Sequence, residues 1–300
     1  FGRPSPSISA ACPPGSSDWS RTPRASDMPF IGIIPPAEAT GQLKAIYDQA
    51  DQRAGAEADD LEVVGAVTES TDSAIGCDAG EASGLGSLGI PLTDDRNKGL
   101  HEADVAIDFT MPLATEENIR ACVKAGAALV IGTTGLESPQ LKAMETGAEK
   151  IPLVYGRNMS IGMNVFMDLV SRATGALGED YDVEIIEAHH HQKIDAPSGT
   201  AIALGERVAD AKGQRLEDLA IYKRYGQVGP REPGVIGFSV IRAGNIVGDH
   251  SVVFGGPEES VELAHRATDR MSFARGAVRA ARWTIGRASG LYSMADVLGL

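Results

Sequence analysis

A fifteen-residue run in the second half of the chain concentrates side chains that can transfer protons and bind anions. It reads EAHHHQKIDAPSGTA over 187–201, with three successive histidines, a lysine two residues later and a Ser-Gly-Thr turn. Histidine and lysine act as general acids or bases when burial and neighbours tune their pKa. A Ser-Gly-Thr turn that opens a helix offers hydroxyl and backbone N–H donors to a carboxylate. The run therefore predicts proton transfer on a small anionic molecule.

Two structural alternatives apply to the same residues. A histidine triplet could bind a metal, since imidazole is the commonest metal ligand. Successive residues of an extended segment point in alternate directions, however, and a metal centre draws its ligands from one face. We therefore expect no metal. Ser198 or Thr200 could simply cap a helix, and capping is compatible with ligand binding at the same helix start.

Alternating strands and helices precede this run and must position it. Apolar strands are predicted at 61–67, 105–110, 128–135 and 152–158, with helices at 115–126 and 140–150 between the later ones. A further short strand at 30–34 and an amphipathic helix at 42–55 could form a first βα unit. Strands that alternate with helices of this length predict right-handed crossovers. We expect an α/β fold with a Rossmann-like, doubly wound parallel sheet.

The pattern changes near residue 159. A long helix is predicted at 161–177, then a strand at 182–191 that ends in polar residues, a helix at 200–211 and three strands between 234 and 268. This order predicts a second α+β domain with a mixed sheet. The predicted organisation is a disordered or foreign segment at 1–29, a dinucleotide-binding domain at 30–158, a substrate-binding and oligomerisation domain at 159–275, and a helix and tail at 276–300 that can return to the first domain.

Bulk properties exclude several classes of protein. The 300 residues carry a formal net charge of −14 and a pI near 4.9, which argues against a surface that tracks nucleic-acid phosphates. The three cysteines are far apart and show no metal-ligand spacing. Neither a membrane-spanning apolar run nor the apolar stretch of a secretory signal is present in the sequence. We expect a soluble, cytoplasmic protein with no nucleic-acid or membrane partner.

The 187–201 run is similar to the signature of the 4-hydroxy-tetrahydrodipicolinate (dihydrodipicolinate) reductase family, whose pattern is E, two histidines, a lysine and DAPSGTA. Other segments agree in the same order: AIDFT, VIGTTG, GRNMSIGMNV, PGVIGFSVIRAGNIVGDH, RMSFARGAVRAARW and GLYSMADVLGL. The resemblance covers about residues 61–300. It implies an oxidoreductase that reduces a cyclic dicarboxylate with NADH or NADPH in lysine and diaminopimelate biosynthesis, and it implies a homotetramer.

The resemblance also assigns roles to particular residues. It makes His189 the general acid/base and Lys193 the proton donor. The substrate would be held by His190, Ser198, Gly199 and Thr200. Arg242 could orient the catalytic loop or be a surface arginine, and the sequence leaves both readings open.

Cofactor contacts are predicted where strands end, because ligands of open parallel sheets lie at the carboxyl ends of the strands. By resemblance and position they are Gly132, Thr133, Thr134, Gly156, Arg157, Asn158 and Met159. Glu69 closes the 61–67 strand, where a carboxylate can accept hydrogen bonds from ribose hydroxyls. No arginine follows it directly to hold a 2′-phosphate, which favours NADH over NADPH.

The N-terminal part departs from the family. Relatives begin with a strand and a GxxGRMG phosphate loop, whereas the corresponding place reads IIPPAEATGQ, in which only Gly41 permits a close backbone approach. Residues 29–50 look more like the opening of carboxymuconolactone decarboxylase or alkylhydroperoxidase-like proteins. A peroxidase would need a cysteine pair near a histidine, and Cys12 stands alone. The remaining alternative is a catalytically impaired paralogue that binds a small dicarboxylate or a partner.

Overall fold

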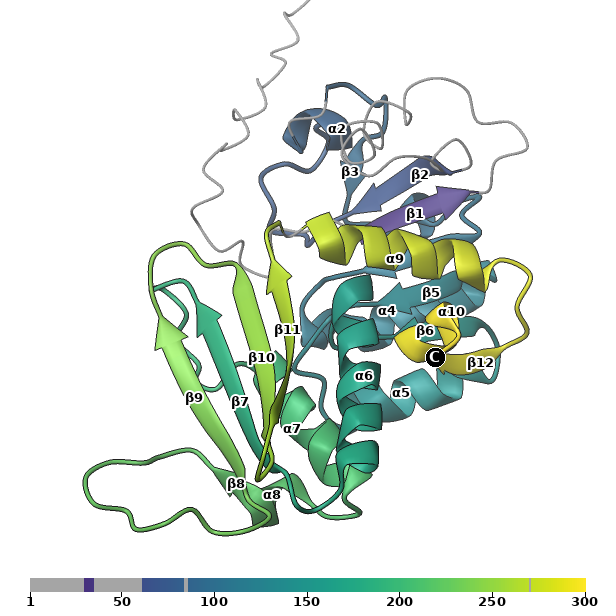
Figure 1. The fold of residues 1–300 in the computed structure, drawn as a ribbon. Helices are drawn as coiled ribbons and strands as arrows, with labels where there is room; N and C mark the ends of the chain where they lie inside the picture. The colour runs from purple at the N-terminus through teal and green to yellow at the C-terminus, as the bar shows by residue number, and fades with distance from the viewer. Residues whose placement is uncertain (1–29, 35–60, 84–85, 270) are drawn as a thin grey trace, which may run out of the picture. The chain divides into compact units, whose positions relative to one another are not determined.

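The structure, a computed structural model, describes residues 30–34, 61–83, 86–269 and 271–300 (Figure 1). These residues form two compact units. The first runs to Arg157 and also includes Ala277–Ser293, and the second comprises Asn158–Gly276 and Met294–Leu300. The predicted segment 1–29 and the predicted helix at 42–55 lie outside the described residues. No helix in the described ranges has the length and apolar character needed to cross a membrane.

The first unit is built on a seven-stranded sheet in the order β12-β6-β5-β4-β1-β2-β3. Strands β2 and β3 pair in parallel, as do β4 with β5, β5 with β6 and β6 with β12. The central strands β4 and β5 are buried along their whole length, as expected for a sheet covered on both faces. The strands are β1 (Phe30–Ile34), β2 (Glu62–Val67), β3 (Leu92–Thr93), β4 (Val105–Asp108), β5 (Ala128–Ile131), β6 (Pro152–Tyr155) and β12 (Gly290–Ser293).

Local sequence explains the crossover helices of this unit. Helix α4 (Pro112–Ala125) begins with a proline, whose missing N–H costs nothing in the first turn, and it ends at Gly126, whose φ of 75° suits glycine. The predicted helices at 115–126 and 140–150 are therefore confirmed, the second as α5 (Ser138–Ala148). The unit also contains α2 (Ala79–Ala82), α3 (Arg96–Gly99) and the part of α9 (Met271–Thr284) from Ala277 onward.

Strand β1 corrects one expectation. The apolar run at 30–34 is a strand, as predicted, but it lies between β2 and β4 and runs antiparallel to both. It is therefore not the first strand of a parallel βα unit. An apolar run specifies that a strand forms but not its direction, which depends on how the chain returns to the sheet. The Rossmann-like fold class itself is confirmed, with one antiparallel strand inside it.

The second unit has a five-stranded mixed sheet in the order β11-β10-β7-β9-β8. Strands β10 and β11 and strands β7 and β10 pair antiparallel, whereas β9 is parallel to both β7 and β8. The predicted mixed sheet is thus confirmed. Its strands are β7 (Asp182–His189), β8 (Ala220–Ile221), β9 (Ile236–Arg242), β10 (Gly248–Gly255) and β11 (Ser260–Ala267), and its helices are α6 (Ile161–Leu177), α7 (Gly199–Ala211), α8 (Leu216–Leu219) and α10 (Met294–Leu298).

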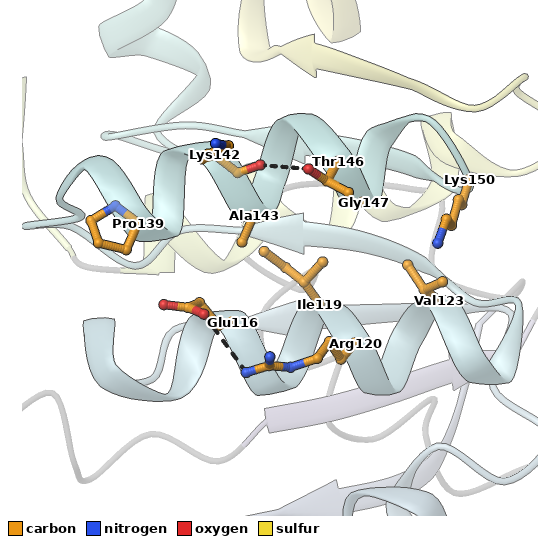
Figure 2. A pocket seen from close by; sticks show the side chains of 10 residues that line it. All are labelled: Glu116, Ile119, Arg120, Val123, Pro139, Lys142, Ala143, Thr146, Gly147 and Lys150. Atoms are coloured by element: carbon orange, nitrogen blue, oxygen red, sulfur yellow. Dashed lines mark hydrogen bonds and ion pairs between the residues drawn. The ribbon is translucent and has the colours of Figure 1, made fainter.

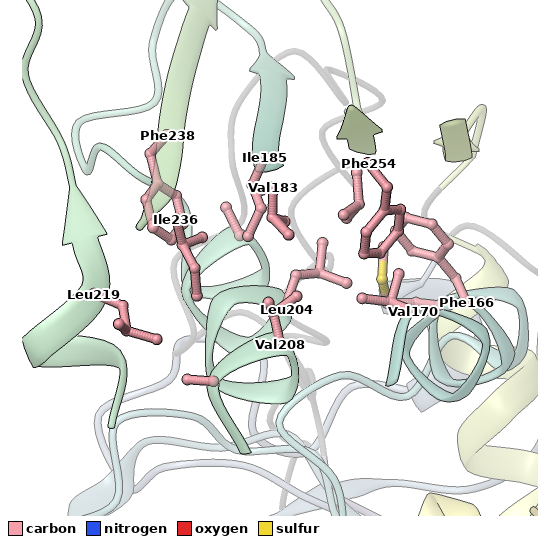
Figure 3. Packing of buried hydrophobic residues seen from close by; sticks show 14 residues of the cluster. Phe166, Val170, Val183, Ile185, Leu204, Val208, Leu219, Ile236, Phe238 and Phe254 are labelled. Carbon is pink, nitrogen blue, oxygen red and sulfur yellow. The ribbon is translucent and has the colours of Figure 1, made fainter. Parts of the chain in front are cut away.

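Helices α6 and α7 pack on one face of this sheet and form its core (Figure 3). Helix α6 begins at Ser160, whose Oγ accepts a hydrogen bond from Met163 N, and it buries Met163, Phe166 and Val170 at helical spacing. Burying an aliphatic or aromatic side chain contributes about 1.5–3 kcal/mol. The strand residues that meet the helices are Val183, Ile185, Ile236, Phe238, Val252 and Phe254. This packing fixes the strand β7 that ends at the histidine run.

Candidate active site

Strand β7 ends in a buried carboxylate that organises the histidine run. Glu187 is only 1% exposed, and its Oε2 accepts a hydrogen bond from Nδ1 of His189 at 2.6 Å. Arg242 donates from Nη1 to Oε2 and from Nη2 to Oε1, both at 2.8 Å. The backbone N–H of Ser198 donates to Oε1 at 2.9 Å. The carboxylate of Glu187 therefore connects β7, β9 and the start of α7 through hydrogen bonds.

The same contacts set the charge of Glu187 and the tautomer of His189. Burial alone would raise the pKa of Glu187, but hydrogen bonds from Arg242, His189 and Ser198 N lower it below its usual value. An ionised carboxylate can only accept hydrogen bonds, so Nδ1 of His189 must carry a proton. The other ring nitrogen, Nε2, is then the one that can accept or deliver a proton.

Arg242 orients the loop after β7. Arg242 lies opposite His189 in the pairing of β7 with β9. In addition to its hydrogen bonds with Glu187, it donates from Nη2 to the carbonyl oxygen of Asp195 at 2.6 Å. Its side chain is 19% exposed. Of the two readings that the sequence left open, the structure therefore selects the orienting arginine over the surface one.

Lys193 lies in this loop and is paired with a carboxylate. Its Nζ is 2.8 Å from Oδ1 of Asp195, and its backbone N–H donates to the carbonyl oxygen of His190. Burial would raise the pKa of Asp195, but the hydrogen bond and charge of Lys193 lower it. The pair holds the Lys193 side chain against the loop that follows β7.

The three successive histidines do not converge on one point. His189 is buried against Glu187, whereas His191 is exposed and its Nδ1 lies 2.9 Å from the carbonyl oxygen of Gly244. Within the described residues, no group of three or more His, Cys, Asp and Glu side chains is placed to hold a metal ion. His189 and His191 diverge because β7 ends at His189 and the chain turns at residues 191–192, so the two residues do not share one strand face.

The Ser-Gly-Thr turn opens helix α7. Ser198 is the N-cap, and its Oγ accepts a hydrogen bond from Ala201 N at 3.1 Å. Thr200 Oγ1 lies 3.3 Å from Nδ2 of Asn158. Gly199 is exposed, and a Cβ placed on it would meet no described atom within 4 Å, so the space beside this residue is open. The first N–H groups of a helix lack partners inside the helix and can bind an anion there.

The predicted cofactor residues of the first unit lie at the carboxyl ends of its parallel strands. Gly132 and Thr133 follow β5, Gly156 follows β6, and Glu69 lies exposed beyond β2. A Cβ on Gly132 would come within 2.2 Å of the Phe109 ring, so only glycine fits there. The neighbouring Thr134 and Arg157 are exposed. Met159, which belongs to the second unit, is buried, with the whole residue only 1% exposed.

A buried hydrogen-bond network fixes the turn after β5. Asp108, with 0% exposure at the end of β4, accepts hydrogen bonds at Oδ1 from Thr110 N and from the Thr110 and Thr133 hydroxyls. Its Oδ2 accepts from Nδ2 of Asn118 at 3.1 Å, and Arg96 Nε donates to the Oδ1 of Asn118 at 2.7 Å. The two strand ends are thereby held in one geometry.

The reversed strand β1 bears on the missing phosphate loop. Ile34, at its carboxyl end, pairs with Glu62 at the beginning of β2, whereas Phe30 pairs with Val67 at the end of β2. The carboxyl end of β1 therefore lies where β2 and β4 begin. This is the side of the sheet opposite the carboxyl ends of β2, β4, β5 and β6. Pro35, Pro36 and Gly41 themselves lie outside the described residues.

A groove on the first unit is unrelated to these residues. It has a volume of about 390 Å³ and lies between α4 and α5, lined by Glu116, Ile119, Arg120, Val123, Pro139, Lys142, Ala143, Thr146, Gly147 and Lys150 (Figure 2). None of the predicted catalytic or cofactor residues lines it. The strand-end sites described above therefore remain the candidates.

Sequence reasoning missed two residues in the second unit. Glu187 belongs to the signature, but the resemblance gives it no role, although residues two apart on a strand share a face and Glu187 is therefore expected to lie beside His189. His250, in the middle of β10, contacts Ser198 Oγ through Nε2 at 3.2 Å. The sequence gives no local signal for that contact, because it depends on the pairing of β7 with β10.

Fold and site together define a class: an α/β protein with a Rossmann-like unit of the nucleotide-binding type and a mixed-sheet unit in which a buried glutamate holds a histidine and an arginine. The chain belongs to the dihydrodipicolinate reductase family. Residues 50–159 match "Dihydrodipicolinate reductase, N-terminus", and residues 162–298 match "Dihydrodipicolinate reductase, C-terminus". This is a family of pyridine-nucleotide-dependent reductases. The resemblance inferred from the sequence is thereby confirmed.

Individual relatives agree with this assignment. The 4-hydroxy-tetrahydrodipicolinate reductase of Alkalilimnicola ehrlichii is 52% identical over 244 residues, which cover 81% of this chain and 91% of the relative. The Acinetobacter baumannii enzyme of the same name is 46% identical over 275 residues, covering 92% and 98%. A dipicolinate-bound dihydrodipicolinate reductase from Paenisporosarcina sp. TG-14 shares the fold, with a TM-score of 0.59, 24% identity and coverage of 77% of this chain and 87% of that chain.

Proposed function

We propose that this chain reduces 4-hydroxy-tetrahydrodipicolinate (dihydrodipicolinate) to tetrahydrodipicolinate, as a step of lysine and diaminopimelate biosynthesis. The observation that carries the proposal is the cluster in the second unit, where Glu187 joins His189, Arg242 and the helix start at Ser198. The cluster combines a proton-transfer pair with donors for a carboxylate. This is the chemistry that reduction of a cyclic dicarboxylate requires beside a hydride source.

Each residue of the cluster has a role in this proposal. Lys193 delivers a proton to the carbon being saturated, and His189, with its tautomer set by Glu187, acts as general acid/base. His190 contacts the substrate. Ser198, Gly199 and Thr200 bind one carboxylate through hydroxyl and backbone N–H donors at the start of α7. The open space beside Gly199 leaves room for a ligand at this residue.

The hydride would come from NADH or NADPH, bound mainly by residues of the first unit. The residues proposed to hold it are Glu69, Gly132, Thr133, Thr134, Gly156, Arg157, Asn158 and Met159. At Gly132 any larger residue would collide with Phe109, so glycine is required there by packing, and the placement of the cofactor rests on the position of Gly132 after the carboxyl end of β5. Exposed Glu69 is followed by Ser70 rather than by an arginine, which favours NADH.

We also propose a homotetramer that forms through the second sheet. Alternate residues of β11 are exposed, from Ser260 to Arg266, on the face opposite the α6 and α7 core. A second copy could cover this face. In this proposal the first unit binds the dinucleotide, and the second unit binds the small dicarboxylate substrate and other subunits. The protein acts in the cytoplasm.

Oxidation of NADH and of NADPH by the purified full-length chain, in the presence of freshly generated dihydrodipicolinate, tests the proposal. Substrate-dependent oxidation with formation of tetrahydrodipicolinate supports the activity, and the ratio of kcat/KM values reports the nucleotide preference. The complete absence of substrate-dependent oxidation with either nucleotide contradicts it.

A further inference from the structure

A second buried histidine touches the carboxylate-binding turn. His250 on β10 is 4% exposed, and its Nε2 lies 3.2 Å from Oγ of Ser198. Its ring also packs edge-on against that of His189, with the ring centroids 5.2 Å apart. His250 is therefore in contact with both halves of the proposed site, the proton-transfer side and the anion-binding side, although no step of the reaction uses it.

The surroundings keep this histidine neutral. Burial and, after it, the neighbouring His189 lower the pKa of His250 to about 4, although Glu187 acts in the opposite direction. At neutral pH the ring accordingly carries one N–H donor and one acceptor nitrogen. The effect of the His250 ring on Ser198 depends on which of its two nitrogens carries the proton.

The hydrogen-bond partners of the two nitrogens show which one carries the proton. Nδ1 of His250 is buried and has no hydrogen-bond partner among the described residues. A buried N–H without an acceptor is rarer in proteins than a buried acceptor without a donor, because losing the hydrogen bond of a donor is costly. The proton is therefore on Nε2, and Nε2–H donates to Ser198 Oγ.

This donation determines where the Ser198 hydroxyl points. A hydroxyl oxygen has two lone pairs and one proton. One lone pair accepts from Ala201 N at 3.1 Å, and the other accepts from His250 Nε2 at 3.2 Å. With both lone pairs occupied, the hydroxyl can act only as a donor toward a ligand.

We propose that His250 is a positioning residue that commits the Ser198 hydroxyl to donate to the substrate carboxylate, and so selects an anionic ligand at the start of α7. The inference rests on the proposed function of that turn. Its consequence is specific to ligand binding: without His250, the hydroxyl can rotate to donate elsewhere, and the carboxylate loses one charge-assisted hydrogen bond.

Binding of dipicolinate to the full-length chain, measured by isothermal titration calorimetry, tests the role of His250. His250→Leu removes the donor at similar volume, and His250→Gln returns an N–H donor near the position of Nε2. We expect His250→Leu to raise the Kd about 10- to 100-fold, the loss expected for one hydrogen bond to a charged group, and His250→Gln to recover most of it. In the reductase assay the KM for substrate should rise more than kcat falls.

Two controls separate this role from a structural one. His265 is the cross-strand neighbour of His250 and packs against Phe166. The variant His265→Leu should leave the Kd unchanged. In a Ser198→Ala background, His250→Leu should add little, because the two residues act through one hydrogen bond. A Kd for His250→Leu equal to that of the wild type, or additive effects in the double variant, would overturn the inference. Dipicolinate binding that depends on His250 without any turnover would instead refute the reductase activity alone.

Discussion

The carboxylate of Glu187 accepts a hydrogen bond from Nδ1 of His189 at 2.6 Å, two residues further along the same strand. The pair points in one direction because residues two apart on a strand share a face. Arg242, on the neighbouring strand β9, donates two hydrogen bonds to the same carboxylate. The geometry of His189, the proposed general acid/base, is thus set by strand pairing rather than by the loop that follows.

Replacing Glu187 by glutamine should reduce kcat about 100-fold, because the amide no longer fixes the His189 tautomer and general acid–base catalysis is worth about 10²–10⁴. It should also lower the free energy of unfolding by about 3 kcal/mol, since Arg242 loses its buried partner. Steady-state kinetics and urea unfolding measure the two effects. Glu184→Gln, on the same strand but paired with Arg224, is the matched control and should leave kcat unchanged.

Glu187 and His250 should both destabilise the protein in acid, but in different pH ranges. His250 has a pKa lowered from 6.5 to about 4, so the unfolded chain takes up its proton first, and about 3 kcal/mol of stability is lost between those two pH values. The pKa of Glu187 is lowered from 4.5, so its stabilisation is complete above pH 4.5 and is lost below it.

Unfolding free energies of the wild type and of His250→Gln, measured by urea titration at successive pH values, test this separation. The variant should show a flatter dependence than the wild type between pH 6.5 and 4, because glutamine does not titrate. Equal slopes in this interval would mean that His250 is not held neutral by the fold.

Asp108 should control nucleotide affinity through the turn after β5. Asp108→Asn replaces one acceptor oxygen by a donor and disrupts the contacts with Thr110, Thr133 or Asn118. We expect the Kd for NADH, followed by fluorescence, to rise about tenfold, as for the loss of one or two hydrogen bonds. Asp104→Asn, before the amino end of the same strand, serves as the control. Unchanged NADH binding by a folded Asp108→Asn variant would contradict the role.

The two exposed glutamates at the ends of β2 give a matched test of nucleotide preference. Glu69 lies beyond the carboxyl end, where a ribose is proposed to bind, and Glu62 lies at the amino end. Glu69→Gln should lower the ratio of kcat/KM for NADH over NADPH about tenfold, through lost hydrogen bonds and lost repulsion of the 2′-phosphate. Glu62→Gln should leave the ratio unchanged. Identical ratios in both variants would remove Glu69 from the cofactor site.

Much of this architecture could be predicted because local patterns and final structure agree. The helix predicted at 161–177 has those bounds in α6, and Gly126 ends α4 as expected. What could not be predicted depends on long-range pairing. The direction of β1, the addition of β12 to the sheet edge beside β6, and the meeting of His250 with Ser198 arise from strand order, which the hydrophobic period does not encode.

The residues proposed to be catalytic are recognisable from a signature, whereas the contacts that hold them are not. The roles proposed for His189 and Lys193 follow from resemblance, but the hydrogen bonds between Glu187 and Arg242 appear only when β7 and β9 are paired. A carboxylate that is 1% exposed and accepts four hydrogen bonds from groups in three segments cannot be identified from residue types alone.

Lys193 and His189 are proposed to carry out a nucleotide-dependent reduction of dihydrodipicolinate. The most direct test is the rate of NADH oxidation with that substrate, compared between the wild type and the Lys193→Met and His189→Gln variants at saturating nucleotide. We expect measurable turnover by the wild type and a loss of kcat of at least about 100-fold in each variant, with dipicolinate still bound by the folded proteins. Full kcat in either variant, or no substrate-dependent oxidation by the wild type, would contradict the account.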